Sequence, residues 1–188
     1  MIISISDIAS GIGLKINNDI FIITEHQHVK PGKGAAFVRA KLRNIKTQQV
    51  LDRTFRSSDK LEEVDLEEKK LQNLYQSGDS FHFMDLTSYE EIVVPNDLLA
   101  DSVKFLQENI EVIATCHQNE ILKITLPTFI IAEIKHTEPG FKGDTATGGT
   151  KPATIDTGAT VQVPLFIDVG EKIKIDTRTG QYVERVKE

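Results

Sequence analysis

Short runs of alternating apolar and polar residues, separated by turn-forming residues, recur along this chain. Alternation with a period of two is typical of β-strands that bury one face. The chain is also rich in Ile, Val and Thr and contains no Trp, and β-branched residues favour strands over helices. The pattern therefore predicts an all-β fold built from small barrels or sandwiches.

The length of 188 residues allows one large domain or two to three small ones, each with a core. The composition turns acidic around residues 61–66, where we place a first boundary, and Pro127 marks a second. We therefore predict domains at residues 1–63, 64–127 and 128–188. Because no Gly/Ser-rich linker separates them, we expect fairly fixed relative orientations.

The turn residues divide the chain into short strands. We expect strands at residues 14–16, 20–23, 36–43, 73–75, 81–84, 111–115, 121–126, 129–134, 161–163, 172–175 and 182–186. One short helix is expected over residues 97–107, with Asn96 or Asp97 as its N-cap. A long Gly/Thr/Lys-rich loop is expected over residues 139–158. Five short strands and one helix, as in the middle segment, are typical of an OB-type barrel.

The net charge of −6 hides a gradient along the sequence. Counting Lys and Arg against Asp and Glu gives +3 for residues 1–63, −8 for residues 64–126 and −1 for residues 127–188. This segregation predicts one face that meets phosphate and another that does not. Chance clustering of ordinary surface charge is the alternative interpretation.

The single cysteine, Cys116, excludes an internal disulfide and indicates a reducing compartment. It lies in an apolar, strand-like stretch, so we expect a buried and inert thiol. The first residues have neither a basic region nor a small-residue cleavage site, and no apolar run approaches the roughly 20 residues of a membrane span. We therefore expect a soluble, cytoplasmic protein that does not associate with membranes.

Residues 29–37 hold Lys33 between two glycines, in the sequence Val-Lys-Pro-Gly-Lys-Gly-Ala-Ala-Phe. Pro31 fixes one φ angle, while Gly32 and Gly34 permit turns that are closed to residues with a Cβ. We expect a hairpin tip that presents Lys33, with Lys30 beside it, as a cationic finger. In the following strand, alternation predicts a basic stripe on one face, formed by Phe37, Arg39, Lys41 and Arg43.

Signatures of catalysis or of metal and cofactor binding are weak. His26 and His28 share a strand face but have no third ligand nearby in sequence, so two surface histidines are expected rather than a metal site. Cys116 and His117 point to opposite faces, which is wrong for a nucleophile and its base. The segment around Lys33 lacks the Ser/Thr and the spacing of a P-loop. We therefore expect no catalytic residue, metal or cofactor, and a protein that is not an enzyme.

Three stretches together resemble the bacterial elongation factor P family over essentially the full chain. They are residues 29–37, residues 139–146 and, most specifically, residues 151–170, with an extension over residues 176–182. The resemblance implies an SH3-like (KOW-type) first domain followed by two OB-fold barrels, arranged as an L that mimics a transfer RNA. It also implies a monomer that binds the ribosome between the P and E sites and relieves stalling at consecutive prolines.

The resemblance further assigns candidate site residues. Lys33 falls on the family's modified position, which points toward the peptidyl-transferase centre and implies a modifying enzyme as a further partner. A lysine there argues against rhamnosylation, which is an arginine chemistry, and does not decide among the other modifications or none. The candidate contacts to the ribosome and to P-site peptidyl-tRNA are Lys30, Pro31, Gly32, Lys33, Gly34, Arg39, Lys41, Arg43, Gly143, Asp144, Thr145, Tyr182 and Arg185.

Two alternatives belong to other classes of protein. A non-ribosomal single-strand nucleic-acid binder built from OB barrels would carry stacking aromatic residues in basic grooves, whereas the middle segment is acidic and aromatic residues are sparse. An enzyme that uses Lys33 as a Schiff-base nucleophile would hold this lysine in an apolar pocket, which an exposed tip flanked by glycines does not offer.

Overall fold

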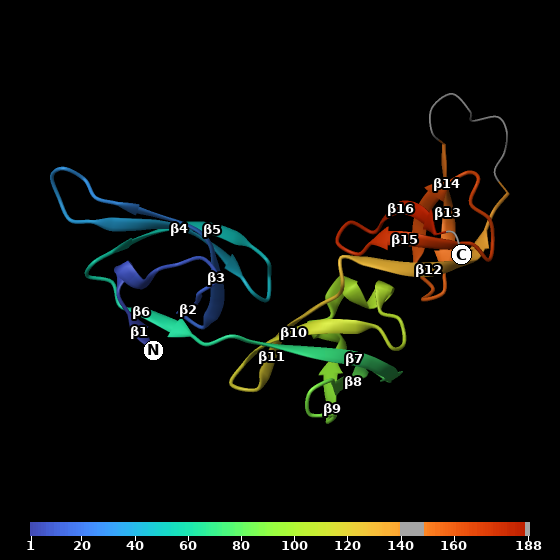
Figure 1. Cartoon of the computed structure of the whole chain (residues 1–188), viewed down its shortest axis with the longest axis horizontal. Coiled ribbons are helices and arrows are strands. Elements are labelled where there is room, and N and C mark those ends of the chain that lie inside the picture. Colours follow the sequence, from blue (N-terminus) through green and yellow to red (C-terminus); the bar gives the residue numbers. More distant parts are fainter. Residues whose placement is uncertain (140–148, 187–188) are drawn as a thin grey trace. The chain divides into compact units, whose positions relative to one another are not determined.

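The computed structural model describes residues 1–139 and 149–186. Within these residues, nearly all regular structure is β-strand, with three short 3-10 helices (Figure 1). The prediction of an all-β fold is thus confirmed. None of the helices in the described part of the chain is long and apolar enough to cross a membrane.

The strands form three sheets. The first has the order β1-β6-β2-β3-β4-β5 and consists of β1 (Ile2–Ile3), β2 (Gly13–Ile16), β3 (Asp19–Val29), β4 (Phe37–Asn44), β5 (Val50–Arg56) and β6 (Leu61–Val64), with the 3-10 helix η1 (Ile5–Asp7) after β1. The second has the order β11-β10-β7-β8-β9 and consists of β7 (Glu67–Ser77), β8 (Ser80–Asp85), β9 (Glu91–Pro95), β10 (Glu111–His117) and β11 (Glu120–Thr125). The third has the order β14-β13-β12-β15-β16 and consists of β12 (Phe129–Thr137), β13 (Thr150–Ile155), β14 (Thr160–Pro164), β15 (Lys172–Asp176) and β16 (Gln181–Val186).

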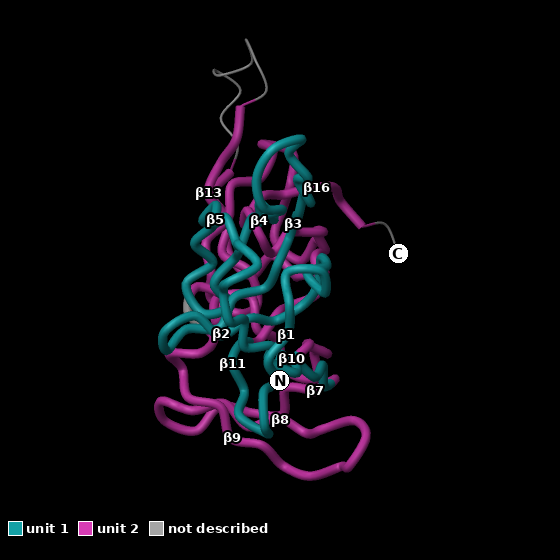
Figure 2. Tube along the Cα trace, turned by 90° about the vertical axis from the view of Figure 1, so that its left-hand side faces the viewer, with its two compact units in different colours: residues 1–69, 114–123 teal, residues 70–113, 124–188 magenta. Residues whose placement is uncertain are grey.

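By compactness the chain divides into two units. One contains residues 1–69 and 114–123, and the other contains residues 70–113 and 124–188 (Figure 2). The first unit holds the whole first sheet and the second unit holds the whole third sheet, while the middle sheet is shared. The division into two units does not test the three predicted domains, so the boundaries after residues 63 and 127 stay a prediction.

The first sheet buries one apolar face. Its core consists of Ile8, Leu14, Phe21, Ile23, Val38, Ala40, Leu42, Phe55 and Leu61. In β4 the buried residues alternate with exposed or half-buried ones, as the sequence predicts. The turn between β2 and β3 places Asn17 at φ = 57°, a left-handed conformation that asparagine tolerates well.

The prediction of a single helix over residues 97–107 is wrong. Two 3-10 helices occupy this stretch, η2 (Asn96–Leu98) and η3 (Ala100–Phe105). The N-cap of η2 is Pro95, not Asn96 or Asp97, and its side chain makes no capping hydrogen bond. With three residues per turn, Leu99 and Phe105 lie on one side of the chain, and both are buried. An α-helical period does not bring these two residues to a common face.

The prediction of a loop over residues 139–158 is also partly wrong, because β13 lies within this range. In β13 the residues Lys151, Ala153 and Ile155 are buried in alternation. Lys151 hides this pattern in the sequence because a charged residue occupies an inward position. Its Nζ donates to the Glu138 carbonyl oxygen at 2.8 Å and lies 4.0 Å from Asp168 Oδ1, so the buried charge has partners.

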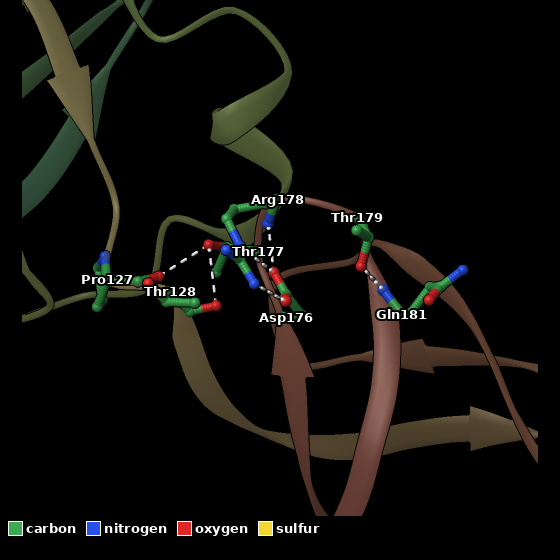
Figure 3. Close-up of polar contacts among 7 residues, drawn as sticks. All are labelled: Pro127, Thr128, Asp176, Thr177, Arg178, Thr179 and Gln181. Carbon is green, nitrogen blue, oxygen red and sulfur yellow. Dashed lines mark hydrogen bonds and ion pairs between the residues drawn. The ribbon is translucent and has the colours of Figure 1, made fainter. Parts of the chain in front are cut away.

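The start of β12 is held against the β15–β16 hairpin (Figure 3). Thr177 Oγ1 donates to the Pro127 carbonyl oxygen at 2.8 Å, and its backbone N–H donates to the Thr128 carbonyl oxygen at 2.9 Å. Beside it, Arg178 Nη2 lies 2.6 Å from Asp176 Oδ2 and Arg178 Nε lies 3.0 Å from Oδ1. The bidentate guanidinium lowers the pKa of Asp176 from its usual 3.8 to about 2.

Candidate functional site

The connection between β3 and β4 forms the tip that the sequence singles out (Figure 1). Lys33 is exposed there, as are Lys30, Gly32 and Gly34, while Pro31 is half-buried. Gly34 has φ = 113°, which only glycine adopts without strain. Gly32 has no positive φ, so the expectation of a special conformation holds for Gly34 and is wrong for Gly32. The tip therefore carries its lysine in solvent.

The basic stripe predicted on β4 lies on the outward face of the first sheet. Arg39 and Arg43 are exposed and Lys41 is half-buried, and all three alternate with the buried Val38, Ala40 and Leu42 (residues 37–44). On the neighbouring strands, Arg39 faces Gln27 and Thr54, and Lys41 faces Glu25 and Asp52. The face is thus cationic along β4 and polar or acidic beside it.

One of the three basic side chains, Lys41, already forms an ion pair with an acidic residue. Lys41 Nζ lies 2.9 Å from Glu25 Oε2, and this bond, more than the nearby charges of Glu25 and Asp52, raises the pKa of Lys41. Arg39 instead lies over the ring of Phe37, with its guanidinium carbon 5.6 Å from the ring centroid. The sequence reveals the stripe but not the pair, because the pairing depends on the register of β3 against β4.

A shallow hollow of about 370 Å³ opens on this face. It is lined by Glu25, His26, Gln27, Arg39, Ala40, Lys41, Asp52, Arg53 and Thr54. Because His26, Ala40 and Arg53 lie in register with one another and point to the other side of the sheet, their backbone forms the floor between the two outward rows. Such an open, mixed surface suits contact with a polar macromolecule better than capture of a small apolar ligand.

Lys123 is a candidate residue that reasoning from the sequence missed. It lies on β11, and burial lowers its pKa, with the positive charge of Arg43 adding a smaller effect. Arg43 and Lys123 belong to one compact unit although 80 positions separate them. No local pattern in the sequence predicts that these two cationic side chains lie near each other.

The remaining candidate residues lie elsewhere. Tyr182 is half-buried opposite the buried Ile175. Arg185 Nη1 lies 2.8 Å from Glu171 Oε1, and its guanidinium carbon lies 5.9 Å from the centroid of the Phe166 ring. Both residues belong to the second compact unit, whereas the Lys33 tip and the basic stripe belong to the first. Gly143, Asp144 and Thr145 lie outside the described residues.

His26 and His28 share a strand face, as predicted. Their ring centroids lie 5.4 Å apart in an edge-to-face arrangement, and His26 Nδ1 lies 3.2 Å from Ser10 Oγ. The described part of the chain, residues 1–139 and 149–186, contains no group of three or more His, Cys, Asp or Glu side chains placed to hold a metal ion. Cys116 is buried, as its apolar surroundings indicate.

Comparison with known families decides what kind of protein carries this tip. Residues 4–61 match the elongation factor P KOW-like domain, residues 66–124 match the elongation factor P OB domain, and residues 130–185 match the elongation factor P C-terminal domain. The chain belongs to the elongation factor P family. Its fold is accordingly a KOW-like domain followed by OB domains, and the family resemblance seen in the sequence is confirmed.

Relatives in the elongation factor P family align over nearly the whole chain. Elongation factor P from Thermoanaerobacter sp. (strain X514) is 47% identical over 184 residues, which cover 98% of this chain and 100% of the relative. Elongation factor P from Caldanaerobacter subterraneus subsp. tengcongensis is 48% identical with the same coverage. Membership in this family makes the protein a translation factor that acts with the ribosome.

Solved structures show the same fold in more distant proteins. Eukaryotic translation initiation factor 5A from Methanococcus jannaschii aligns with a TM-score of 0.51 at 22% identity, covering 68% of this chain and 92% of that one. A translation initiation factor eif-5a family protein from Naegleria fowleri aligns with a TM-score of 0.52 at 19% identity, covering 67% and 98%. At this identity the likeness concerns the fold alone.

Proposed function

We propose that this member of the elongation factor P family binds the ribosome between the P and E sites and stimulates peptide-bond formation at consecutive prolines. The observation that supports this most directly is the exposed Lys33 at the end of a hairpin whose outward face carries Arg39, Lys41 and Arg43. Cytoplasmic action, as a monomer and without a membrane partner, is part of the same proposal.

Proline reacts poorly because its ring fixes φ and its amine is secondary, so productive geometry is rarely sampled. A protein speeds such a step without donating or accepting a proton when it holds the reacting end in an attack-ready position. In this proposal the protein is not an enzyme with a reactive group of its own. Its Lys33 acts by contact with the CCA end of the peptidyl-tRNA.

The basic face supplies the affinity in this mechanism. Lys30, Arg39, Lys41 and Arg43 bind tRNA backbone phosphates, an interaction that is independent of sequence and weakens with salt. Gly32 and Gly34 leave the backbone beside Lys33 bare, and Pro31 stiffens the loop, so the tip approaches the tRNA closely. In the third domain, the segment with Gly143, Asp144 and Thr145 meets the E-site codon region, and Tyr182 and Arg185 make further contacts with the ribosome.

The test compares Lys33→Ala with Lys60→Ala, an exposed lysine of the same unit that lies off the tip. Each variant is added to a reconstituted translation reaction with a Pro-Pro-Pro reporter, and its affinity for ribosomes is measured separately. We expect Lys33→Ala to lower the rate of rescue about tenfold or more while its affinity changes about twofold or less. Undiminished rescue by this variant would remove Lys33 from the mechanism.

The proposed modification of Lys33 has its own test. Protein purified from its own host is digested, and the peptide that contains residues 29–37 is weighed by mass spectrometry. An added mass on Lys33 supports a longer side chain with more reach and more hydrogen-bond donors, and identifies the chemistry of the modifying enzyme. A peptide of unmodified mass contradicts the modification and leaves the bare ammonium as the acting group.

A further inference from the structure

A stacked pair of rings lies on the outward face of the middle sheet, away from the Lys33 tip in the sequence. The rings of Tyr75 and His82 have centroids 4.4 Å apart and planes 14° apart. Tyr75 on β7 lies opposite His82 on β8, and His82 lies opposite Val93 on β9. The three side chains therefore form one row across three strands of this sheet.

One carboxylate fixes both rings. Tyr75 Oη donates to Glu91 Oε1 at 3.0 Å, and His82 Nδ1 hydrogen-bonds to the same oxygen. These bonds lower the pKa of Glu91, the bond to His82 more than the bond to Tyr75, so Glu91 is ionised at neutral pH. The bond to Glu91 also raises the pKa of Tyr75, which keeps its hydroxyl a donor.

The cluster is open to solvent on the side that the stack does not use. Tyr75 is 47% exposed although one ring face lies against His82, and Val93 is 56% exposed. The Glu91 side chain is 50% exposed. Within residues 1–139 and 149–186, Tyr75 and His82 both bond to Oε1 of Glu91, so Oε2 is available to a donor from a partner. The site thus offers a flat ring face and a carboxylate oxygen side by side.

The stretch of sequence that carries this cluster is acidic. Residues 71–103, which include the end of β7 and all of β8 and β9, contain six Asp or Glu and no Lys or Arg. Lys69 and Lys70 lie at the start of β7, outside this stretch. A cation that approaches the cluster along β8 and β9 therefore meets no like charge from these two strands, whereas a polyanion meets mainly repulsion there.

We propose that Tyr75, His82 and Glu91 form a docking site for an arginine side chain of a basic protein. A guanidinium is planar, stacks on an aromatic face and donates to a carboxylate in one plane, and the cluster presents both features. A nucleobase would also stack on Tyr75, but its phosphates would meet the acidic face, so the charge favours arginine. The inference rests on the proposed ribosome association, which supplies basic proteins as partners.

Photo-crosslinking identifies the partner without altering the three cluster residues. Val93 is replaced by p-benzoylphenylalanine, and the full chain is bound to ribosomes, irradiated and mapped by mass spectrometry. A crosslink to an arginine-containing segment of a ribosomal protein supports the inference, and a crosslink to ribosomal RNA overturns it. The same probe at Lys33 serves as the reference. A crosslink from position 33 but none from position 93 overturns the arginine site alone, while none from either position overturns the proposed function as well.

Affinity measurements complete the test. We expect Tyr75→Ala and Glu91→Gln each to weaken ribosome binding about three- to tenfold, because each removes one half of the arginine contact. Tyr75→Phe keeps the ring and should change the affinity about twofold or less. The matched controls are Tyr89→Ala and Glu108→Gln, two exposed residues of the same unit. Equal effects of the cluster variants and the controls, with unchanged circular dichroism, would overturn the inference.

Discussion

The ring of Phe105 lies against Gly180, with its Cζ atom 3.3 Å from the position that a Cβ on Gly180 would take. Phe105 ends η3 beside the middle sheet, and Gly180 closes the β15–β16 hairpin of the third sheet, so the contact joins two sheets within one compact unit. Hydrogen bonds accompany it. Gln107 Nε2 donates to the Ile131 carbonyl oxygen at 2.9 Å, and Thr157 Oγ1 donates to the Lys104 carbonyl oxygen at 2.6 Å.

Gly180→Ala is expected to destabilise the protein for two reasons. Gly180 has φ = 70°, which costs an alanine about 1 kcal/mol, and the added methyl group also presses on the buried Phe105. Gly158→Ala is the matched control, because Gly158 has φ = 87° and open space around its Cβ position. We expect Gly180→Ala to lose about 1 kcal/mol more than the control in urea unfolding followed by circular dichroism. Equal losses would mean that the ring moves aside freely.

The Asp176–Arg178 pair predicts a specific dependence of stability on pH. The folded state lowers the pKa of Asp176 from 3.8 to about 2, so folding favours the ionised carboxylate. The resulting stabilisation is fully present above about pH 4 and is lost as the pH falls toward 2. Asp176→Asn should therefore be less stable than the parent chain at pH 6, and the difference should disappear near pH 2.

The measurement is a set of urea unfolding curves between pH 6 and pH 2, with Asp101→Asn as the control for loss of an exposed aspartate. The control should show no such convergence with the parent chain, because Asp101 is an exposed residue of η3 that takes no part in the Asp176–Arg178 pair. A constant difference between Asp176→Asn and the parent chain at all pH values would contradict the assignment and point to the geometry of the turn instead.

The sequence predicts those parts of the fold that depend on local pattern. Alternation places Val38, Ala40 and Leu42 inside β4 and its basic residues outside, because one buried face imposes a period of two. The same pattern fails for β13, where the inward Lys151 is satisfied by the carbonyl oxygen of Glu138. That acceptor lies 13 positions away and has no signature in the residues around Lys151.

For the candidate site, too, the sequence predicts the local features and misses the long-range contacts. The Lys33 tip is visible in the sequence because Pro31 and Gly34 are local turn signals. The pairing of Lys41 with Glu25 and the approach of Arg43 to Lys123 depend on strand register and on packing between distant segments. A sequence without alignment carries no such long-range information, so electrostatic partners are the part of the site that only the structure supplies.

Charge reversal of the stripe tests its role in binding. We expect Arg39→Glu combined with Lys41→Glu to weaken ribosome association and to reduce the slope of log affinity against log salt concentration by about two, one for each lost phosphate contact. The control is Lys15→Glu combined with Lys60→Glu, which makes the same change of charge on other strands and turns of this unit. An affinity and slope that match the control would show that the stripe is ordinary surface.

The ion pair between Glu25 and Lys41 predicts the opposite result for a single neutral substitution. Glu25 Oε2 lies 2.9 Å from Lys41 Nζ, so the carboxylate competes with a phosphate for the same ammonium group. Glu25→Gln should tighten ribosome binding about two- to fivefold near 0.1 M salt, and the gain should shrink at high salt as the charges are screened. Glu62→Gln, which neutralises an exposed glutamate on β6, should leave the affinity unchanged. Weaker binding by Glu25→Gln would mean that Glu25 holds Lys41 in the orientation that phosphate needs, rather than competing for it.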